Sequence, residues 1–189
     1  MESLFVSAGL VALAEMGDKT QLLALVLATR FRKPWPIVFG ILVATVLNHA
    51  LAGWVGHTVG LYFSTGTLRW ILGLSFIAMA IWTLIPDKLD DKDAHAAERF
   101  GKWGVFGATT LAFFVAEIGD KTQIATIALA ARYENVVLVV AGTTVGMLLA
   151  NAPVVWLGEA LCRRIPLRTM HVLTAVLFLV LGIAALLWR

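Results

Sequence analysis

Two short acidic segments stand inside long apolar stretches of this chain. The segment 14–21 reads Ala-Glu-Met-Gly-Asp-Lys-Thr-Gln, and the segment 116–123 repeats it with a single change, Met16 to Ile118. An ionisable side chain placed in hydrocarbon costs roughly 2.5–3.5 kcal/mol even on the insertion scale. Because the same charged residues recur in the same order, we interpret the two segments as parts of one functional site.

The side chains of the two motifs offer oxygen ligands and no thiolate. We expect Glu15, Asp18, Glu117 and Asp120 to bind a divalent metal ion, since hard oxygen ligands suit Mg²⁺, Ca²⁺ or Mn²⁺ better than Zn²⁺ or Cu²⁺. Other polar residues that could complete the cation shell are Thr20, Gln21, Thr122, Gln123, Asn48, His49 and Asn151. For the last three, hydrogen bonding between helices is an equally good interpretation.

A lysine follows the acidic pair of each motif. Lys19 comes four residues after Glu15, and Asp18 three residues after it, so a continuous helix would place all three on one face. We expect Lys19 and its counterpart Lys121 to balance the charge of the site. The alternative is that each Glu and Lys neutralise each other as buried structural pairs. The recurrence of Gly, Thr and Gln together with the charges favours the functional interpretation.

A glycine separates the two acids of each motif. Gly17 and Gly119 weaken a helix at these points, so we expect a helix break in each motif. Such a break frees backbone carbonyls in the middle of the membrane, which is tolerated only against a polar cavity. The expected breaks therefore also indicate a polar site at the midplane.

The composition places these motifs in an all-α integral membrane protein. Of 189 residues, 60% are hydrophobic and 14% are charged, with a mean hydropathy of +0.86, whereas soluble domains are about 45–50% apolar and about 25% charged. The net charge of +3 does not indicate nucleic-acid binding, because the basic residues are scattered at loop ends. Six transmembrane helices are expected in the lipid bilayer, near residues 3–29, 35–61, 68–86, 104–131, 136–161 and 169–188.

The chain consists of two related halves. A shift of 102 residues aligns 3–87 with 105–189 without a gap, and seven of the 21 identities fall in the motif. Each half holds three predicted spans, an odd number, so the second half must be inverted relative to the first. We therefore expect a first repeat at 1–87, a polar linker at 88–104 and a second repeat at 105–189, with the site at the midplane between the repeats.

The distribution of basic residues predicts the orientation. Ten Lys and Arg residues lie in the loops after the first, third and fifth spans, and three lie on the opposite side. By the positive-inside rule the linker is cytoplasmic and both termini are outside, in a multi-pass protein of the inner membrane. The single cysteine, Cys162, excludes an intramolecular disulfide and a cysteine-based metal site. The sequence is compatible with a homo-oligomer as well as with a monomer.

Two copies of Glu-x-Gly-Asp-Lys-Thr, in three-span halves joined by a polar loop, resemble the Gdt-type cation exchangers over essentially the whole chain. That family includes Golgi manganese/calcium transporters and the Mne-type manganese exporters of bacteria. The resemblance implies a secondary transporter, not an enzyme, that exports Mn²⁺ from the cytoplasm in exchange for protons and has no resident cofactor. It matches Glu15 and Asp18 to the first acidic pair, and Glu117 and Asp120 to the second. Ca²⁺/H⁺ exchange, a passive divalent-cation channel and a membrane metalloenzyme remain as alternatives.

Overall fold

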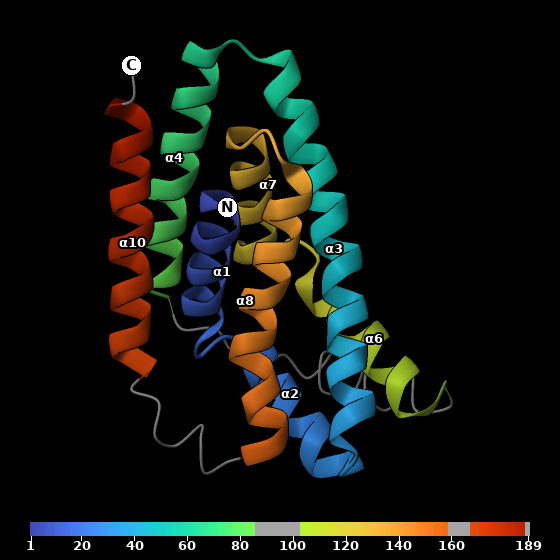
Figure 1. The fold of residues 1–189 in the computed structure, drawn as a ribbon. Coiled ribbons are helices and arrows are strands. Elements are labelled where there is room, and N and C mark those ends of the chain that lie inside the picture. Colours follow the sequence, from blue (N-terminus) through green and yellow to red (C-terminus); the bar gives the residue numbers. More distant parts are fainter. Residues whose placement is uncertain (86–102, 159–166, 188–189) are drawn as a thin grey trace.

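The computed structural model describes residues 1–85, 103–158 and 167–187, and these residues form helices and no strand (Figure 1). The helices are α1 (Glu2–Glu15), α2 (Lys19–Phe31), α3 (Pro34–Tyr62), α4 (Thr65–Thr83), α6 (Gly104–Glu117), α7 (Lys121–Arg132), α8 (Val136–Leu157) and α10 (Leu167–Leu187). Helices α3, α4, α8 and α10 are each long and apolar enough to cross a membrane. The predicted all-helical class of the chain is thus confirmed, and these helices fit a membrane protein.

The first and fourth predicted spans are not single helices. The segment 3–29 is divided into α1 and α2, and the segment 104–131 into α6 and α7. Both divisions fall at the glycine of the motif, where Gly17 has a φ of +88° and Gly119 a φ of +76°. This left-handed backbone region is readily available to glycine and strained for other residues, so it ends one helix before the next begins.

Local sequence signals start several of the helices. Ser64 caps α4 by accepting a hydrogen bond from the backbone N–H of Thr67 at 3.3 Å, and Asn135 caps α8 by accepting one from Leu138 at 3.0 Å. Pro34 stands in the first turn of α3, where its missing N–H is not needed. The connections between α3 and α4 and between α7 and α8 are short, so the second helix of each pair runs back across the bundle.

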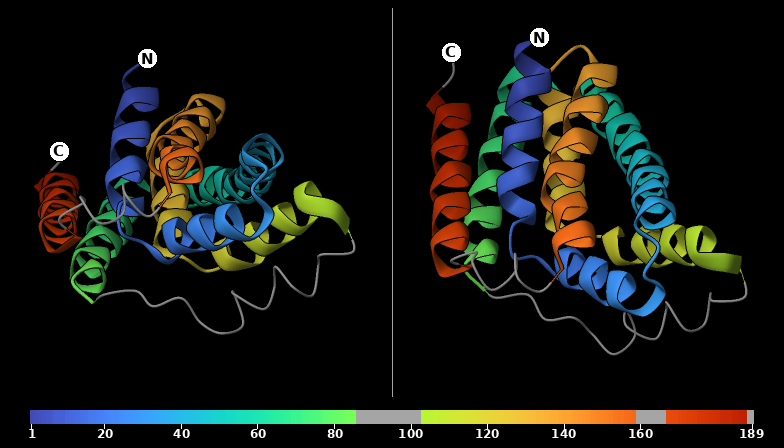
Figure 2. Two further views of the ribbon diagram at one scale, coloured as in Figure 1. Left: turned by 90° about the horizontal axis from the view of Figure 1, so that it is seen from below. Right: turned by 60° about the horizontal axis from the view of Figure 1, so that its bottom comes forward.

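The end of α10 lies at the same end of the bundle as the α3–α4 and α7–α8 turns (Figure 1), and the right-hand view of Figure 2 shows the start of α1 at that end as well. There the Tyr133 hydroxyl donates to Glu2 Oε1 at 3.3 Å, and Arg69, Arg132 and Ala185 line a shared pocket of about 400 Å³. Figure 2 shows α2 and α6 running crosswise to α4 and α10 near the opposite end. The predicted linker 88–104 falls mostly outside the described residues, as does Cys162.

Two glycines allow helices from opposite halves to pack closely. Gly40 lies in α3 against α6, and Gly142 lies in α8 against α1. A Cβ atom would come within 2.7 Å of a threonine Cβ at Gly40 and within 2.9 Å of a serine Cβ at Gly142. The two contacts correspond position by position at an offset of 102 residues: Gly40 with Phe106 and Thr109, and Gly142 with Leu4 and Ser7. Small residues at such crossings let membrane helices approach each other.

Candidate metal-binding site

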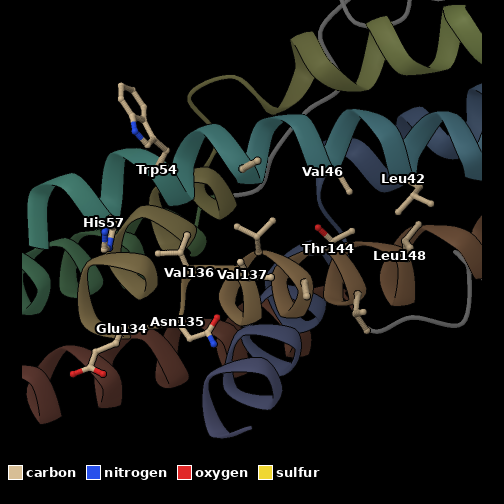
Figure 3. A pocket seen from close by; sticks show the side chains of 14 residues that line it. Leu42, Val46, Trp54, His57, Glu134, Asn135, Val136, Val137, Thr144 and Leu148 are labelled. Atoms are coloured by element: carbon tan, nitrogen blue, oxygen red, sulfur yellow. The ribbon is translucent and has the colours of Figure 1, made fainter.

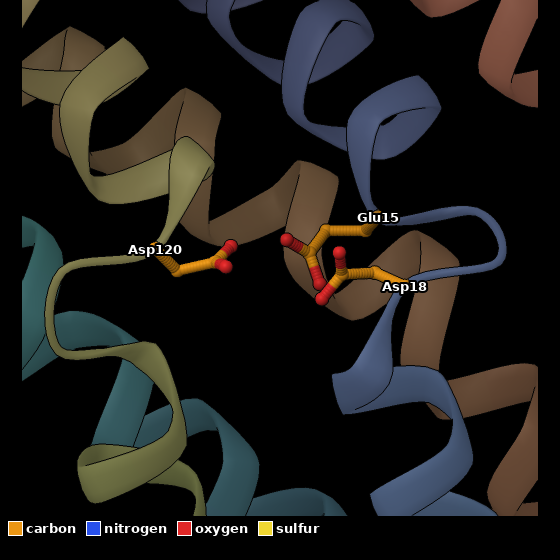
Figure 4. A group of neighbouring side chains, drawn as sticks. All are labelled: Glu15, Asp18 and Asp120. Carbon is orange, nitrogen blue, oxygen red and sulfur yellow. The ribbon is translucent and has the colours of Figure 1, made fainter. Parts of the chain in front are cut away.

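The two helix breaks meet in the middle of the bundle, and each presents an aspartate to the other (Figure 4). Asp18 caps α2, with Oδ2 3.4 Å from the backbone N of Thr20, and Asp120 caps α7, with Oδ2 3.5 Å from the backbone N of Thr122. The positive ends of two helix dipoles therefore face the site and stabilise these buried carboxylates. The breaks thus hold anionic ligands within an apolar bundle.

The motif glutamines close the two breaks. The backbone N–H of Gly17 donates to Gln21 Oε1 at 3.0 Å, and that of Gly119 donates to Gln123 Oε1 at 2.8 Å. In addition, Gln21 Nε2 donates to the carbonyl of Ala150 in α8 at 3.1 Å. The amide oxygens that the sequence suggested as cation ligands are therefore engaged with the loop backbone, and their clearest role is to hold its shape.

Each motif glutamate ends a helix and accepts a hydrogen bond from the motif threonine. The Thr20 hydroxyl donates to Glu15 Oε2, and the Thr122 hydroxyl donates to Glu117 Oε2 at 3.1 Å. Both glutamates are fully buried, and neither Oε1 has a hydrogen-bond partner among the residues described. Buried polar atoms are normally satisfied, so these two oxygens are candidate ligand atoms for a cation.

The two lysines pair crosswise between the motifs. Lys121 Nζ contacts Asp18 Oδ1, and Lys19 Nζ lies 3.6 Å from Asp120 Oδ1. The expectation that Lys19 shares a helix face with Glu15 and Asp18 is wrong, because α1 ends at Glu15 and Lys19 begins α2. Each lysine therefore balances an aspartate of the other half of the chain.

Three carboxylates from the two motifs converge on one point. Glu15, Asp18 and Asp120 are buried and place one oxygen each within 4.8 Å of the others (Figure 4). Oxygens bound to one ion at about 2.3–2.6 Å can lie up to roughly 5 Å apart, so this spacing fits a shared divalent cation. Glu117 is equally buried but does not belong to this group of three.

The polar residues predicted in α3 and α8 differ in their hydrogen-bond partners. Asn151 Nδ2 is 3.5 Å from Glu15 Oε2 and also donates to the carbonyl of Met147 at 3.2 Å. Asn48 donates to a backbone carbonyl of α6 at 3.0 Å, the helix–helix bond that was one of its two interpretations. His49 is fully buried, and neither ring nitrogen has a hydrogen-bond partner in the described part of the chain.

A separate groove of about 1060 Å³ runs between α3 and α8 (Figure 3). Its lining is mostly apolar, with Leu42, Val46 and Val137 along its length and the polar residues His57 and Glu134 toward one end. None of the motif residues lines this groove. The acidic cluster, rather than this groove, is therefore the candidate site.

Helices long enough to span a membrane, with buried carboxylates gathered where two helices break, are typical of membrane transport proteins for cations. The chain belongs to the divalent cation/proton antiporter GDT1 family, whose profile matches residues 3–91 and again 105–188. The predicted family is confirmed, and so is a transporter rather than an enzyme. Because the family activity is antiport, it also disfavours the passive-channel alternative.

Relatives in other organisms extend over nearly the whole chain. A Vibrio cholerae protein, provisionally named a manganese exporter, is 51% identical over 185 residues, covering 97% of this chain and 90% of its own length. A GDT1-like protein of Synechocystis is 29% identical and covers 93% and 92%, respectively. A GDT1-like protein of rice is 28% identical and covers 94% of this chain and 71% of its own length. No solved structure matches the chain.

Proposed function

We propose that this antiporter exports Mn²⁺ from the cytoplasm in exchange for protons, through a site built by both motifs. The observation that carries the proposal is the convergence of Glu15, Asp18 and Asp120. In our proposal Glu117, which is equally buried, is the fourth ligand and binds at another stage of the cycle. The choice of Mn²⁺ is supported by the name of the Vibrio cholerae relative. Oxygen ligands alone would also accept Ca²⁺.

The charge of the site explains obligatory exchange. Four carboxylates and two ammonium groups give the two motifs a net charge of −2, which is unfavourable in a low-dielectric cavity. One divalent cation neutralises this charge, and so do two protons. If the protein changes between inward-open and outward-open conformations only when the site is neutral, one M²⁺ is exchanged for two H⁺ and uncoupled leak is prevented.

We further propose that the chain forms two inverted three-helix repeats, in which α1 with α2 and α6 with α7 act as broken spans. The contacts that recur at an offset of 102 residues support this arrangement, as do the crosswise lysine–aspartate pairs. The ten-to-three distribution of Lys and Arg supports a cytoplasmic linker and external termini.

The orientation is testable with single cysteines in a Cys162→Ser background. A cysteine at Thr65, the exposed first residue of α4 next to the α3–α4 turn, should react with a membrane-impermeant thiol reagent in intact spheroplasts. A cysteine at Lys92 in the linker should react only after the membrane is opened. Labelling of the linker alone in intact spheroplasts would mean that the proposed orientation is inverted.

Transport in proteoliposomes tests the exchange itself. A pH gradient across the membrane should drive Mn²⁺ transport by the reconstituted protein in the direction opposite to proton flow. The condition at which net Mn²⁺ flux reverses should depend on the pH gradient and not on the membrane potential, because one-for-two exchange moves no net charge. A voltage-dependent reversal point would contradict the stoichiometry, and Mn²⁺ flux without proton movement would indicate a channel. Faster exchange of Ca²⁺ than of Mn²⁺ would contradict the proposed cargo.

A further inference from the structure

The two halves differ at one polar position close to the acids. Residue 49 in α3 and residue 151 in α8 correspond in the repeat, but the first is histidine and the second is asparagine. Asn151 reaches Glu15, with Nδ2 3.5 Å from Oε2. His49 is fully buried and, within the described residues, has no hydrogen-bond partner at either ring nitrogen. Buried polar groups normally have a hydrogen-bond partner, so the His49 imidazole is a candidate ligand.

The correspondence between the two halves implies a position for His49 near Glu117. The contacts of Gly40 and Gly142 recur at an offset of 102 residues. At the same offset Asn151 corresponds to His49 and Glu15 corresponds to Glu117, so the counterpart of the Asn151–Glu15 contact is a contact between His49 and Glu117. A contact of the preceding residue is consistent with this placement. Asn48, the neighbour of His49, is bonded to a carbonyl of α6 in the turn before Glu117.

The acidic cluster itself is not symmetric. It contains Glu15, Asp18 and Asp120, and the corresponding set in the other half is Glu117, Asp120 and Asp18. In transporters built from inverted repeats, the inward-open and outward-open states arise when the repeats exchange arrangements around a fixed site. The opposite state would then gather the second set, with His49 in the place that Asn151 occupies here.

An imidazole changes which ions such a site prefers. Ca²⁺ and Mg²⁺ are hard cations that take oxygen ligands, whereas first-row transition metals also accept imidazole nitrogen. Building on the proposed Mn²⁺ exchange, we propose that His49 is a nitrogen ligand of the transported ion in the opposite conformation, beside Glu117, and that it favours Mn²⁺ over Ca²⁺ and Mg²⁺. Selection by ion type would then operate in only one of the two conformations.

Electron spin-echo spectroscopy of bound Mn²⁺ provides a direct test. Mn²⁺ at saturation should populate the conformation that binds it more tightly, so the purified wild type should show nitrogen coupling that changes on ¹⁵N-histidine labelling. His49→Asn, which copies the residue of the other half, should lose the coupling. His57→Asn, in the groove between α3 and α8, should keep it. Mn²⁺ without histidine coupling in the wild type would overturn the proposal.

Exchange measurements separate this inference from the proposed function. In proteoliposomes, His49→Asn should lower Mn²⁺ exchange relative to Ca²⁺ exchange by about ten-fold, since even an outer-shell change costs roughly 10–100-fold in metal affinity. A wild type with no divalent cation/proton exchange would contradict the proposed function. A wild type that exchanges both ions, with the same Mn²⁺/Ca²⁺ ratio in His49→Asn, would leave that function intact and overturn the role of His49.

Discussion

The two motif copies carry the same side chains except at one position, yet their surroundings differ. The Lys121 side chain is 1% exposed and contacts Asp18, whereas the Lys19 side chain is 22% exposed and lies 3.6 Å from Asp120. Glu15 belongs to the acidic cluster and Glu117 does not. Each motif is completed by the opposite half, so identical residues acquire different electrostatic environments.

Removal of any one carboxylate charge should have the largest effect on Mn²⁺ efflux, because the proposed site uses carboxylates from both motifs. Glu15→Gln, Asp18→Asn, Glu117→Gln and Asp120→Asn preserve shape and remove charge, and each should reduce Mn²⁺ efflux from loaded cells at least about 100-fold, equivalent to ~2.7 kcal/mol. The matched control is Glu134→Gln, an exposed acid outside the motifs, which should retain efflux. Normal efflux by two of the four amide variants would contradict the four-carboxylate site.

The two crosswise pairs should differ in their contribution to stability. Asp18→Asn removes the carboxylate facing the deeply buried Lys121, and breaking a buried pair costs about 3 kcal/mol. Asp120→Asn removes the carboxylate facing the more accessible Lys19, where solvent screening reduces the loss to about 1 kcal/mol. Unfolding of the purified variants in detergent measures both. Equal losses would mean that the exposures of the lysines do not decide the pair energies.

Packing between the halves should be nearly symmetric, in contrast to the charges. Gly40→Ala and Gly142→Ala each place a methyl group against the facing helix, so each should destabilise the protein by about 1–3 kcal/mol. Gly9→Ala in α1 is the control, because a Cβ there meets nothing within 4 Å and alanine favours the helix. Thermal unfolding in detergent checks the order, and a loss of stability at Gly9 matching the other two would contradict the packing argument.

Loss of a threonine hydroxyl should lower Mn²⁺ affinity less than loss of a carboxylate charge does, and the loss should differ between the halves. Thr20→Val removes the hydrogen bond to Glu15, a member of the cluster, whereas Thr122→Val removes the one to Glu117. A hydrogen bond to a charged group contributes about 1.5–3 kcal/mol, and we expect the lower end of this range for Thr20 and less for Thr122. Mn²⁺ affinities of the two purified variants test the order, and a larger loss in Thr122→Val would reverse the proposed asymmetry.

Much of this architecture follows from the sequence, because apolar length and a repeated motif are local features. The class, the helical segments and the positions of the helix breaks could all be predicted, since Gly17 and Gly119 each separate the two acids of a motif. The crosswise pairing could not be predicted. Spacing arguments for Lys19 assume a continuous helix, and the break makes its direction depend on how closely the two halves approach.

The crosswise pairs also set a condition on biogenesis. Ribosomes deliver the first half of the chain to the insertion machinery before residues 120 and 121 exist, so Asp18 and Lys19 reach the bilayer ahead of the groups that pair with them in the finished protein. Each unmatched charge costs roughly 2.5–3.5 kcal/mol at the centre of a helix in the membrane. We therefore expect the first broken span to remain at the insertion channel until the second broken span has been synthesised. Stable integration of the first half would then require synthesis of the second.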